Sequence, residues 1–229
     1  MSPSHRADPE DPRLRAARTK RDRTRRALLD AGLEAFGSGG WTSTMEEIAA
    51  AAGVSPTTAY NHFPTKHALL GHVYGPLLRP LVVAAERDVA VDRPMVDAVT
   101  DQVKALTSAL FGQRVLAAAL FCAVQEYTIR TGGPPDPADA LDPRNLAPAP
   151  LPVRLLVEHG QRTGQFRTHP PALEVGAMTT NLLLIRCVNR PGESEEATVE
   201  MLLTVIFGML RPDLLAAAGL DERPFRIGG

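Results

Sequence analysis

One short window constrains this chain more than any other part of its sequence. Thr44 with Glu47 three residues later fits a capping box, in which two side chains close the start of a helix. Gly53 then supplies a tight turn, and Ser55 followed by Pro56 restarts a helix as N-cap and first-turn proline. Two short helices joined by a glycine turn are typical of a helix-turn-helix. This window therefore predicts a compact helical unit near the N-terminus.

The residues on either side of the window predict one more helix each. Apolar residues before it share one helical face, namely Leu28, Ala31, Ala35 and Phe36. The run Gly37–Gly40 ends that helix. The helix that begins at Pro56 is expected to run to residue 62 or 63, and the run Pro64–Lys66 opens a fourth helix.

The rest of the chain is also expected to be helical, because no run of alternating apolar and polar residues lies between hairpin turns. Expected helices cover 66–88 (broken near Gly75–Pro76 or Pro80), 93–110, 113–130, 152–163, 171–189 and 194–210. A loop with seven prolines fills 131–152. The fold class is therefore all-α.

Composition excludes several classes of protein. With 44% apolar and 22% charged residues, the 229-residue chain is globular. Its longest apolar runs are about ten residues, whereas a bilayer span needs roughly 20, so no membrane helix is expected. The N-terminus lacks the apolar segment of a secretory signal. Cys122 and Cys187 lie in apolar stretches and are expected to be reduced core thiols of a cytoplasmic protein.

The net charge of −1 hides a basic segment. Between Arg13 and Arg26 there are eight basic residues and a single acid, Asp22. We expect residues 1–22 to be a disordered basic arm, and the run Arg13–Arg26 to lie along phosphates or in the minor groove of DNA. A solvated run without a partner is the alternative for this segment.

The stretch Arg23–Leu70 resembles the TetR family of bacterial transcription regulators. Its family pattern falls on Thr44, Ile48–Ala49, Ala52–Ser55, Tyr60, Phe63 and Lys66. Thr57 and Ala59 depart from that pattern, where the family often has glycine and a large aliphatic residue. The resemblance implies an N-terminal three-helix DNA-binding domain over 23–68 and a helical ligand-binding and dimerisation domain over 69–229.

The resemblance further implies that the helix beginning at Pro56 enters the major groove. Asparagine can pair with adenine and threonine can touch a thymine methyl group, so the polar side chains of this helix suit base edges. Its amide N–H groups suit a phosphate. The expected DNA-binding residues are Thr44, Ser55, Thr57, Thr58, Tyr60, Asn61, His62, Lys66 and Arg23.

The last two expected helices, 171–189 and 194–210, carry apolar arcs that are too broad for one buried face. We expect them to form a homodimer interface, and a deeper monomeric core stays open as the alternative. A two-fold dimer would place two recognition helices about 34–36 Å apart, one turn of a palindromic operator.

The resemblance also implies that a small-molecule effector binds among the middle helices. Candidate pocket residues combine polar and aromatic side chains in apolar helices: Phe111, Phe121, Gln125, Glu126, Tyr127, Phe166, Asn181 and Arg186. For each polar member taken singly, a hydrogen bond or an ion pair within the core is the favoured explanation. The expected function is a ligand-responsive repressor.

Two other functions remain open at this point. A regulator controlled by a partner protein, or an activator, would carry the same DNA-binding unit without an effector. An all-helical enzyme is the third class, but no nucleophile-elbow, zinc-protease, dinucleotide or phosphate-loop motif occurs in the sequence. His62, His67 and His72 are five apart and spread around a helix, so neither a metal site nor a cofactor is expected.

Overall fold

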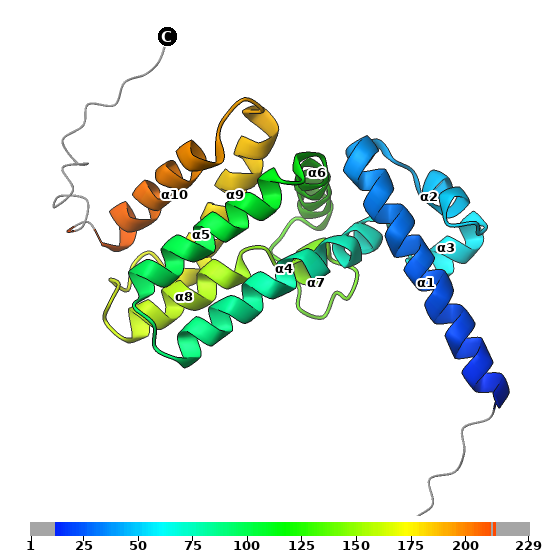
Figure 1. The fold of residues 1–229 in the computed structure, drawn as a ribbon, viewed down its shortest axis with the longest axis horizontal. Helices are drawn as coiled ribbons and strands as arrows, with labels where there is room; N and C mark the ends of the chain where they lie inside the picture. The colour runs from blue at the N-terminus through cyan, green and yellow to red at the C-terminus, as the bar shows by residue number, and fades with distance from the viewer. Residues whose placement is uncertain (1–11, 212, 214–229) are drawn as a thin grey trace, which may run out of the picture.

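The structure, a computed structural model, describes residues 12–211 and 213. Over these residues it contains helices and no strand, which confirms the all-α fold class. Figure 1 shows the α1–α3 unit on one side, the remaining helices on the other and α4 between them. The elements are α1 (Pro12–Gly39), η1 (Gly40–Thr42), α2 (Met45–Ala51), α3 (Pro56–His62), α4 (Lys66–Ala90), α5 (Met95–Phe111), α6 (Arg114–Thr131), α7 (Pro143–Leu146), α8 (Leu151–Arg162), α9 (Ala172–Asn189) and α10 (Glu195–Leu210).

Helix α1 differs from the expectation for the basic arm. It begins at Pro12, so residues 12–22 are helical instead of disordered, and residues 1–11 lie outside the described residues. The basic run 13–26 therefore continues directly into the helix whose buried residues include Leu28 and Phe36. Periodicity alone missed this extension because it has no apolar face to mark it as helical.

Helix α4 runs without interruption past Pro76 and Pro80, where a break was expected. A proline lacks the backbone N–H and crowds the preceding turn, which is why its sequence predicts a break. Tyr74 and Leu78 flank Pro76 and are only 2% and 1% exposed. Packing on both sides of the proline holds the helix together. The expected domain boundary at 68/69 consequently falls inside one continuous helix.

By length and composition alone, α4 is apolar enough to cross a membrane. Ten of its residues are buried inside the protein, where the helix packs against α1, α5, α7 and α8. This packing explains the buried apolar residues of α4 as those of a core helix, whereas Val83 remains 56% exposed.

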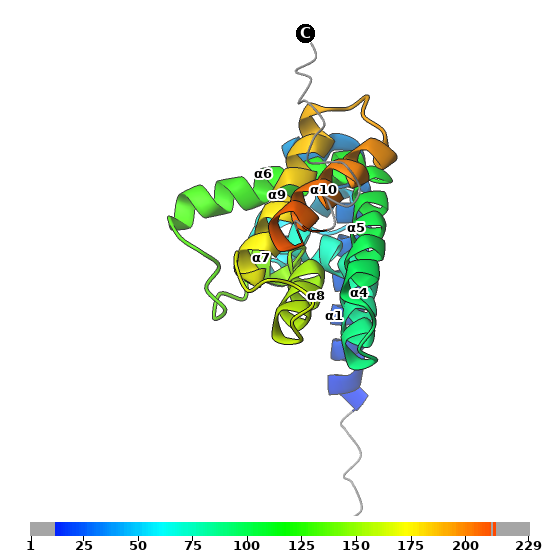
Figure 2. The ribbon, with the colours of Figure 1, turned by 90° about the vertical axis from the view of Figure 1, so that its left-hand side faces the viewer.

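Helix α8 is the centre of the C-terminal part of the fold. It contacts α4, α5 and α9, and its residues Val153, Leu156 and Val157 are fully buried. Helix α10 packs against α5 and α9. Figure 2 shows these helices stacked together while one end of α6 projects to the side. The expected helices 93–110, 113–130, 152–163, 171–189 and 194–210 all occur, each within two residues of its expected bounds.

The two cysteines have different environments. Neither forms a disulfide. Cys187 is buried, and burial raises the pKa of its thiol to about 11. Cys122 is exposed, so the expectation of a core thiol is wrong there: its side chain points away from the packed face of α6.

Two helical glycines predict stability changes of opposite sign. A Cβ at Gly176 in α9 would lie 2.8 Å from the carbonyl oxygen of Pro150, whereas a Cβ at Gly37 in α1 would meet nothing within 4 Å. Gly37→Ala should raise the free energy of unfolding by about 0.5–1 kcal/mol, because glycine costs that much in a helix. Gly176→Ala should lower it by roughly 1–3 kcal/mol through overpacking. Urea denaturation monitored by circular dichroism measures both, and changes of the same sign would contradict the packing seen at Gly176.

Candidate nucleic-acid interface

The start of α2 is closed by the expected capping box. The side chain of Thr44 accepts a hydrogen bond from the Glu47 amide at 3.2 Å, and the Thr44 amide donates to Glu47 Oε2 at 2.8 Å. These hydrogen bonds lower the pKa of Glu47. Both side chains are exposed, so the amide end of α2 is presented at the surface.

The turn between α2 and α3 depends on Gly53. Its φ of +69° lies in the left-handed region that glycine adopts without cost. The adjacent Val54 amide donates to the Ala49 carbonyl at 2.9 Å, which closes the turn. Ala49 and Ala59 are both fully buried, so the two helices cross on small side chains.

Helix α3 begins as its sequence predicts. Ser55 is the N-cap and accepts a hydrogen bond from the Thr58 amide, and Pro56 occupies the first turn. Ala59 is the only buried residue of this helix. Three side chains on its outer side are exposed: Thr57, Tyr60 and Asn61. The helix therefore presents these three side chains at the surface, while Thr58 and His62 are half-buried.

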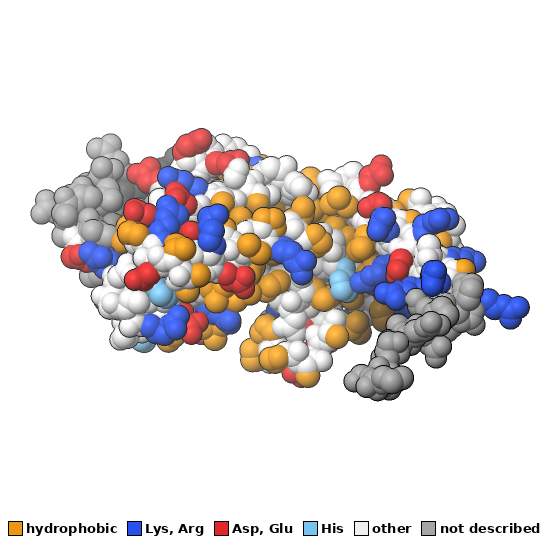
Figure 3. Space-filling model, turned by 60° about the horizontal axis from the view of Figure 1, so that its bottom comes forward, with side chains coloured by type: hydrophobic (Ala, Val, Ile, Leu, Met, Phe, Trp, Pro, Cys, Tyr) orange, Lys and Arg blue, Asp and Glu red, His pale blue; other side chains and the backbone are white. Residues whose placement is uncertain are grey.

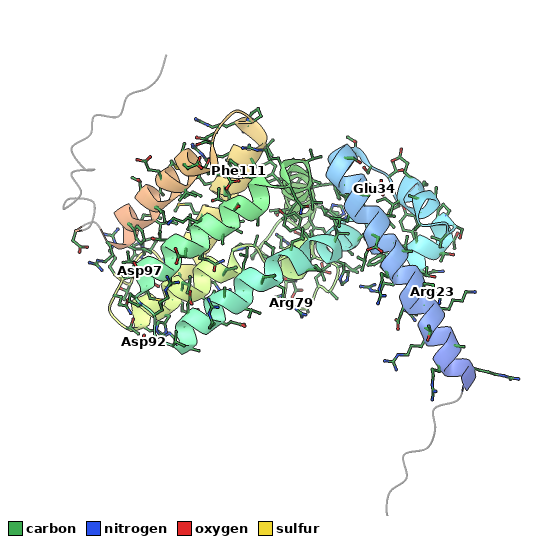
Figure 4. The ribbon with its side chains drawn as sticks, viewed as in Figure 1. Arg23, Glu34, Arg79, Asp92, Asp97 and Phe111 are labelled. Carbon is green, nitrogen blue, oxygen red and sulfur yellow. The ribbon has the colours of Figure 1, made fainter. Side chains whose placement is uncertain are left out.

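The C-terminal end of α3 is held against α1. Phe63 is buried, and the guanidinium of Arg25 lies 4.3 Å from the centre of its ring. Arg25 Nη1 also donates to the carbonyl oxygen of His62 at 3.4 Å. Burial, together with the positive charges of Arg21 and Arg25, lowers the pKa of His62. His62, expected at a phosphate, is therefore half-buried beside α1, while the expected Arg23 is exposed (Figure 4).

Lys66 is engaged within the protein. Its ammonium donates to the Trp41 carbonyl at 2.7 Å and lies 3.8 Å from the centre of the indole ring. Burial lowers its pKa. Sequence reasoning placed Lys66 at the DNA backbone and did not consider Trp41, which the turn η1 brings over the start of α4. The ammonium of Lys66 therefore holds η1 against the start of α4.

Trp41 also links the α1–α3 unit to α6. Its indole N–H donates to Glu126 Oε2 at 2.8 Å, and the other carboxylate oxygen lies 3.3 Å from His67 Nε2. The His67 ring stacks edge-on with Trp41 and with Tyr127, at centroid distances of 4.9 and 5.3 Å. Tyr127 in turn donates a hydrogen bond to Asp139 in the loop before α7. A chain of direct contacts thus joins the helix-turn-helix to this loop.

His67 makes stability depend on pH. Burial is the main cause that lowers its pKa, and Glu126 opposes the shift. The unfolded chain keeps a histidine pKa of about 6.5, so it binds the proton more readily than the folded protein. The free energy of unfolding should therefore fall as the pH drops through about 6.5 toward the folded pKa. In His67→Gln the fall between pH 7.5 and 5.5 should be shallower than in the wild type. Thermal unfolding at a series of pH values tests this, and parallel curves would refute it.

The eight side chains expected to line one pocket do not converge. Glu126 and Tyr127 belong to the contacts with Trp41 and His67 described above. Gln125 and Asn181 are exposed on α6 and α9. Arg186 forms an ion pair with Glu193 in the turn before α10.

The aromatic members of that set are equally dispersed. Phe166 packs against Phe207 of α10, with ring centres 6.4 Å apart. Phe111 lies at the end of α5 under the guanidinium of Arg114, and Phe121 is half-buried on α6. Periodicity identified side chains that face a core, but it does not say which of them face the same space.

A groove lies elsewhere, between α4 and the segment that contains α7 and the start of α8. Its volume is about 780 Å³, and its lining is mostly apolar with polar groups from His72, Arg79 and Asn145. The apolar part comes from Pro76, Val83, Leu146, Pro148 and Leu151. Figure 3 shows hydrophobic side chains gathered across the middle of the underside, with basic side chains concentrated at the α1 end.

The sequence contained one signal for this groove. Gly71 and Gly75 are four residues apart on α4, and a Cβ on either would lie 2.6 Å from an atom of Leu146. Small residues at this spacing let α7 approach the backbone of α4 closely. The sequence alone does not single out this pair, because a glycine next to Pro76 also fits the expected break in α4.

The geometry of α1–α4 agrees with a known family. The model described as bacterial regulatory proteins of the tetR family matches residues 28–73, the window that contains the capping box, the glycine turn and α3. This segment of the chain is therefore similar to the N-terminal domain of TetR-family proteins. Among the described residues no group of three or more histidine, cysteine, aspartate or glutamate side chains is placed to bind a metal.

Solved structures of other proteins are similar in fold over most of this chain. FadR of Thermus thermophilus, a transcriptional repressor in complex with lauroyl-CoA, is 23% identical, with a TM-score of 0.62 over 80% of this chain and 93% of its own. FadR of Bacillus subtilis, in complex with stearoyl-CoA, is 16% identical, with a TM-score of 0.58 over 79% and 96%. RolR in complex with resorcinol is 18% identical, with a TM-score of 0.59 over 91% and 97%. No curated protein matches this sequence.

Proposed function

We propose that this TetR-family protein is a ligand-responsive repressor that binds a palindromic operator as a homodimer in the cytoplasm. The observation that carries the proposal is α3, a helix whose outer polar residues are exposed while its single buried residue, Ala59, fixes it to α2. Residues 23–68 form the DNA-binding domain and residues 69–229 the regulatory and dimerisation domain. A homologous repressor, FadR of Thermus thermophilus, has the same fold.

The proposed DNA contacts divide by chemistry. Thr57, Thr58 and Asn61 read base edges with short polar side chains. Thr57 and Asn61 are exposed, and Thr58 is half-buried with its hydroxyl hydrogen-bonded to Ser55. Tyr60 and His62 contact phosphates, as does the amide end of α2 at Thr44. The remaining proposed DNA contacts are made by Ser55, Lys66 and Arg23.

The proposed dimer interface consists of α9 and α10. Helix α9 exposes Leu173, Ile185 and Val188, which are 57%, 41% and 36% exposed although they are apolar. On α10 the half-buried apolar residues are Val199, Met201, Leu203, Val205 and Met209. A second copy of the chain would cover both surfaces in a two-fold arrangement, in which each patch meets its own copy.

The proposed effector site is the groove between α4 and α7. Its volume of about 780 Å³ falls within the usual range for small-molecule sites. The apolar lining with Arg79 and His72 suits a molecule with an apolar body and an anionic group. The acyl-CoA molecules bound by the two FadR proteins have this chemistry. Binding there must favour a spacing of the two DNA-binding domains that does not fit the operator.

Fluorescence anisotropy tests the proposal. The probes are a duplex from the region upstream of the gene for this protein and a scrambled duplex, each at several salt concentrations. Selective binding of two protomers per duplex supports the DNA-binding part. Release of the duplex by lauroyl-CoA, but not by coenzyme A alone, supports an effector with an apolar body. Selective binding that no acyl-CoA or phenol relieves would favour control by a partner protein instead, and no binding at low salt would overturn the proposal.

A further inference from the structure

The N-terminal part of α1 lies outside the packed core. Residues 13–24, which we call the α1 extension, precede Arg25, and the first buried residue of the helix is Leu28. From Arg15 to Arg23 every side chain is exposed. Figure 1 shows this end of α1 continuing past α2 and α3, away from the C-terminal helices. The side chains of residues 15–23 are therefore not buried against the core, although such burial is the usual source of helix stability in proteins.

The charges of the α1 extension are unfavourable for an isolated helix. It contains six basic residues and one acid, and its first turn has no acidic residue. Positive charge near a helix N-terminus opposes the helix dipole. Like charges three residues apart, such as Arg18 with Arg21 and Lys20 with Arg23, repel each other by roughly 0.2–0.5 kcal/mol per pair. Next to a bound polyanion, the same positive charges would stabilise the helical segment instead of destabilising it.

The α1 extension has a fixed relation to the recognition helix. Arg25 connects α1 to the C-terminal end of α3 through the His62 carbonyl and the Phe63 ring. The thirteen residues from Pro12 to Thr24 extend beyond this anchor. At 1.5 Å per residue they reach about 20 Å. That length corresponds to roughly six base pairs of DNA at 3.4 Å each.

We propose that the α1 extension is a second DNA-binding element, which lies along the phosphates that flank the major groove occupied by α3. The proposal rests on the proposed function, since α3 sets where the α1 extension meets the duplex. Basic side chains point to all sides of this helix, so it suits a backbone contact and not the reading of particular bases. DNA is favoured over other polyanions because the anchor at Arg25 joins the α1 extension to the DNA-reading helix itself.

The test compares the salt dependence of binding in matched variants. The extension variant carries Arg15→Gln, Lys20→Gln and Arg21→Gln, and the control variant carries Lys104→Gln, Arg162→Gln and Arg167→Gln. Both variants lose three positive charges from exposed positions, but the control positions lie on or beside α5 and α8. The dissociation constant is measured at five salt concentrations on a duplex selected with this protein from a random-sequence library. A third variant, Thr57→Ala with Asn61→Ala, reports on base reading.

We expect the salt slope of the extension variant to fall by about 2 or more, because each lost phosphate contact removes about 0.9 and a dimer has two extensions. Its preference for the selected duplex over a scrambled one should remain. The control variant should keep the wild-type slope, and the Thr57→Ala/Asn61→Ala variant should lose the preference but keep the slope. An extension variant with the wild-type slope would overturn the role of the α1 extension alone. Failure of the wild-type protein to select or bind any duplex would overturn the DNA-binding function as well.

Discussion

Replacing Thr57 and Asn61 with alanine should abolish selective operator binding while the fold stays intact. A good contact to a base edge contributes about 1–3 kcal/mol of discrimination. Losing about 2 kcal/mol in each half-site removes about 4 kcal/mol per dimer, which is close to a thousand-fold in affinity. Both side chains are exposed and Asn61 makes no hydrogen bond within the described residues, so the free energy of unfolding should hardly change.

Anisotropy titrations with the selected and the scrambled duplex measure this effect. The matched control is Gln113→Ala with Thr168→Ala, which removes an amide and a hydroxyl from exposed positions outside the α1–α3 unit and outside α9 and α10. The control should bind like the wild type. If the Thr57→Ala/Asn61→Ala variant kept its preference for the selected duplex, α3 would not be the element that reads the bases.

Replacing Ile185 with glutamate should convert the proposed homodimer to a monomer. Ile185 is 41% exposed on α9, so the single chain tolerates a charge there, but a two-fold interface over α9 would bury two carboxylates. The desolvation penalty of an unpaired ion is several kcal/mol. We expect the dimer to dissociate at least about 100-fold more readily, which corresponds to about 2.7 kcal/mol. Operator binding should fall with it, because one short recognition helix does not supply a full site.

Sedimentation velocity over a range of concentrations tests the oligomeric state. Ile129→Glu is the matched control, since Ile129 is 80% exposed on α6 and lies outside the proposed interface. That variant should sediment like the wild type. A monomeric wild-type protein, or an Ile185→Glu variant that remains dimeric, would show that α9 does not form the interface.

The contacts around Trp41 suggest how the groove and the DNA-binding domain communicate. The loop before α7 carries Asp139, which accepts a hydrogen bond from Tyr127, and Tyr127 stacks with His67. His67 and Glu126 then contact Trp41 in the turn beside α2. The same loop leads into Leu146, which lines the groove. A molecule that displaces α7 therefore acts on a continuous set of contacts that ends at the helix-turn-helix.

Local chemistry in the sequence determined the DNA-binding unit. The capping box at Thr44, the turn at Gly53 and the N-cap at Ser55 each involve atoms only a few residues apart. Such short-range hydrogen bonds and backbone preferences do not depend on the rest of the fold, so the predicted start of α2 and start of α3 both occur in the structure. The matched helices of the C-terminal domain followed in the same way from their apolar periodicity.

Tertiary packing decided the features that could not be predicted, or were wrongly predicted, from the sequence. Pro76 predicted a break in α4, but burial of Tyr74 and Leu78 keeps the helix continuous. The groove is formed where Leu146 approaches Gly75 from a segment seventy residues away, and no pattern within α4 specifies that partner. Lys66 and Glu126 likewise meet Trp41 only because η1, α4 and α6 converge. Helical periodicity shows which side of a helix is buried, whereas the side chains that share a cavity are decided by how the helices pack against one another.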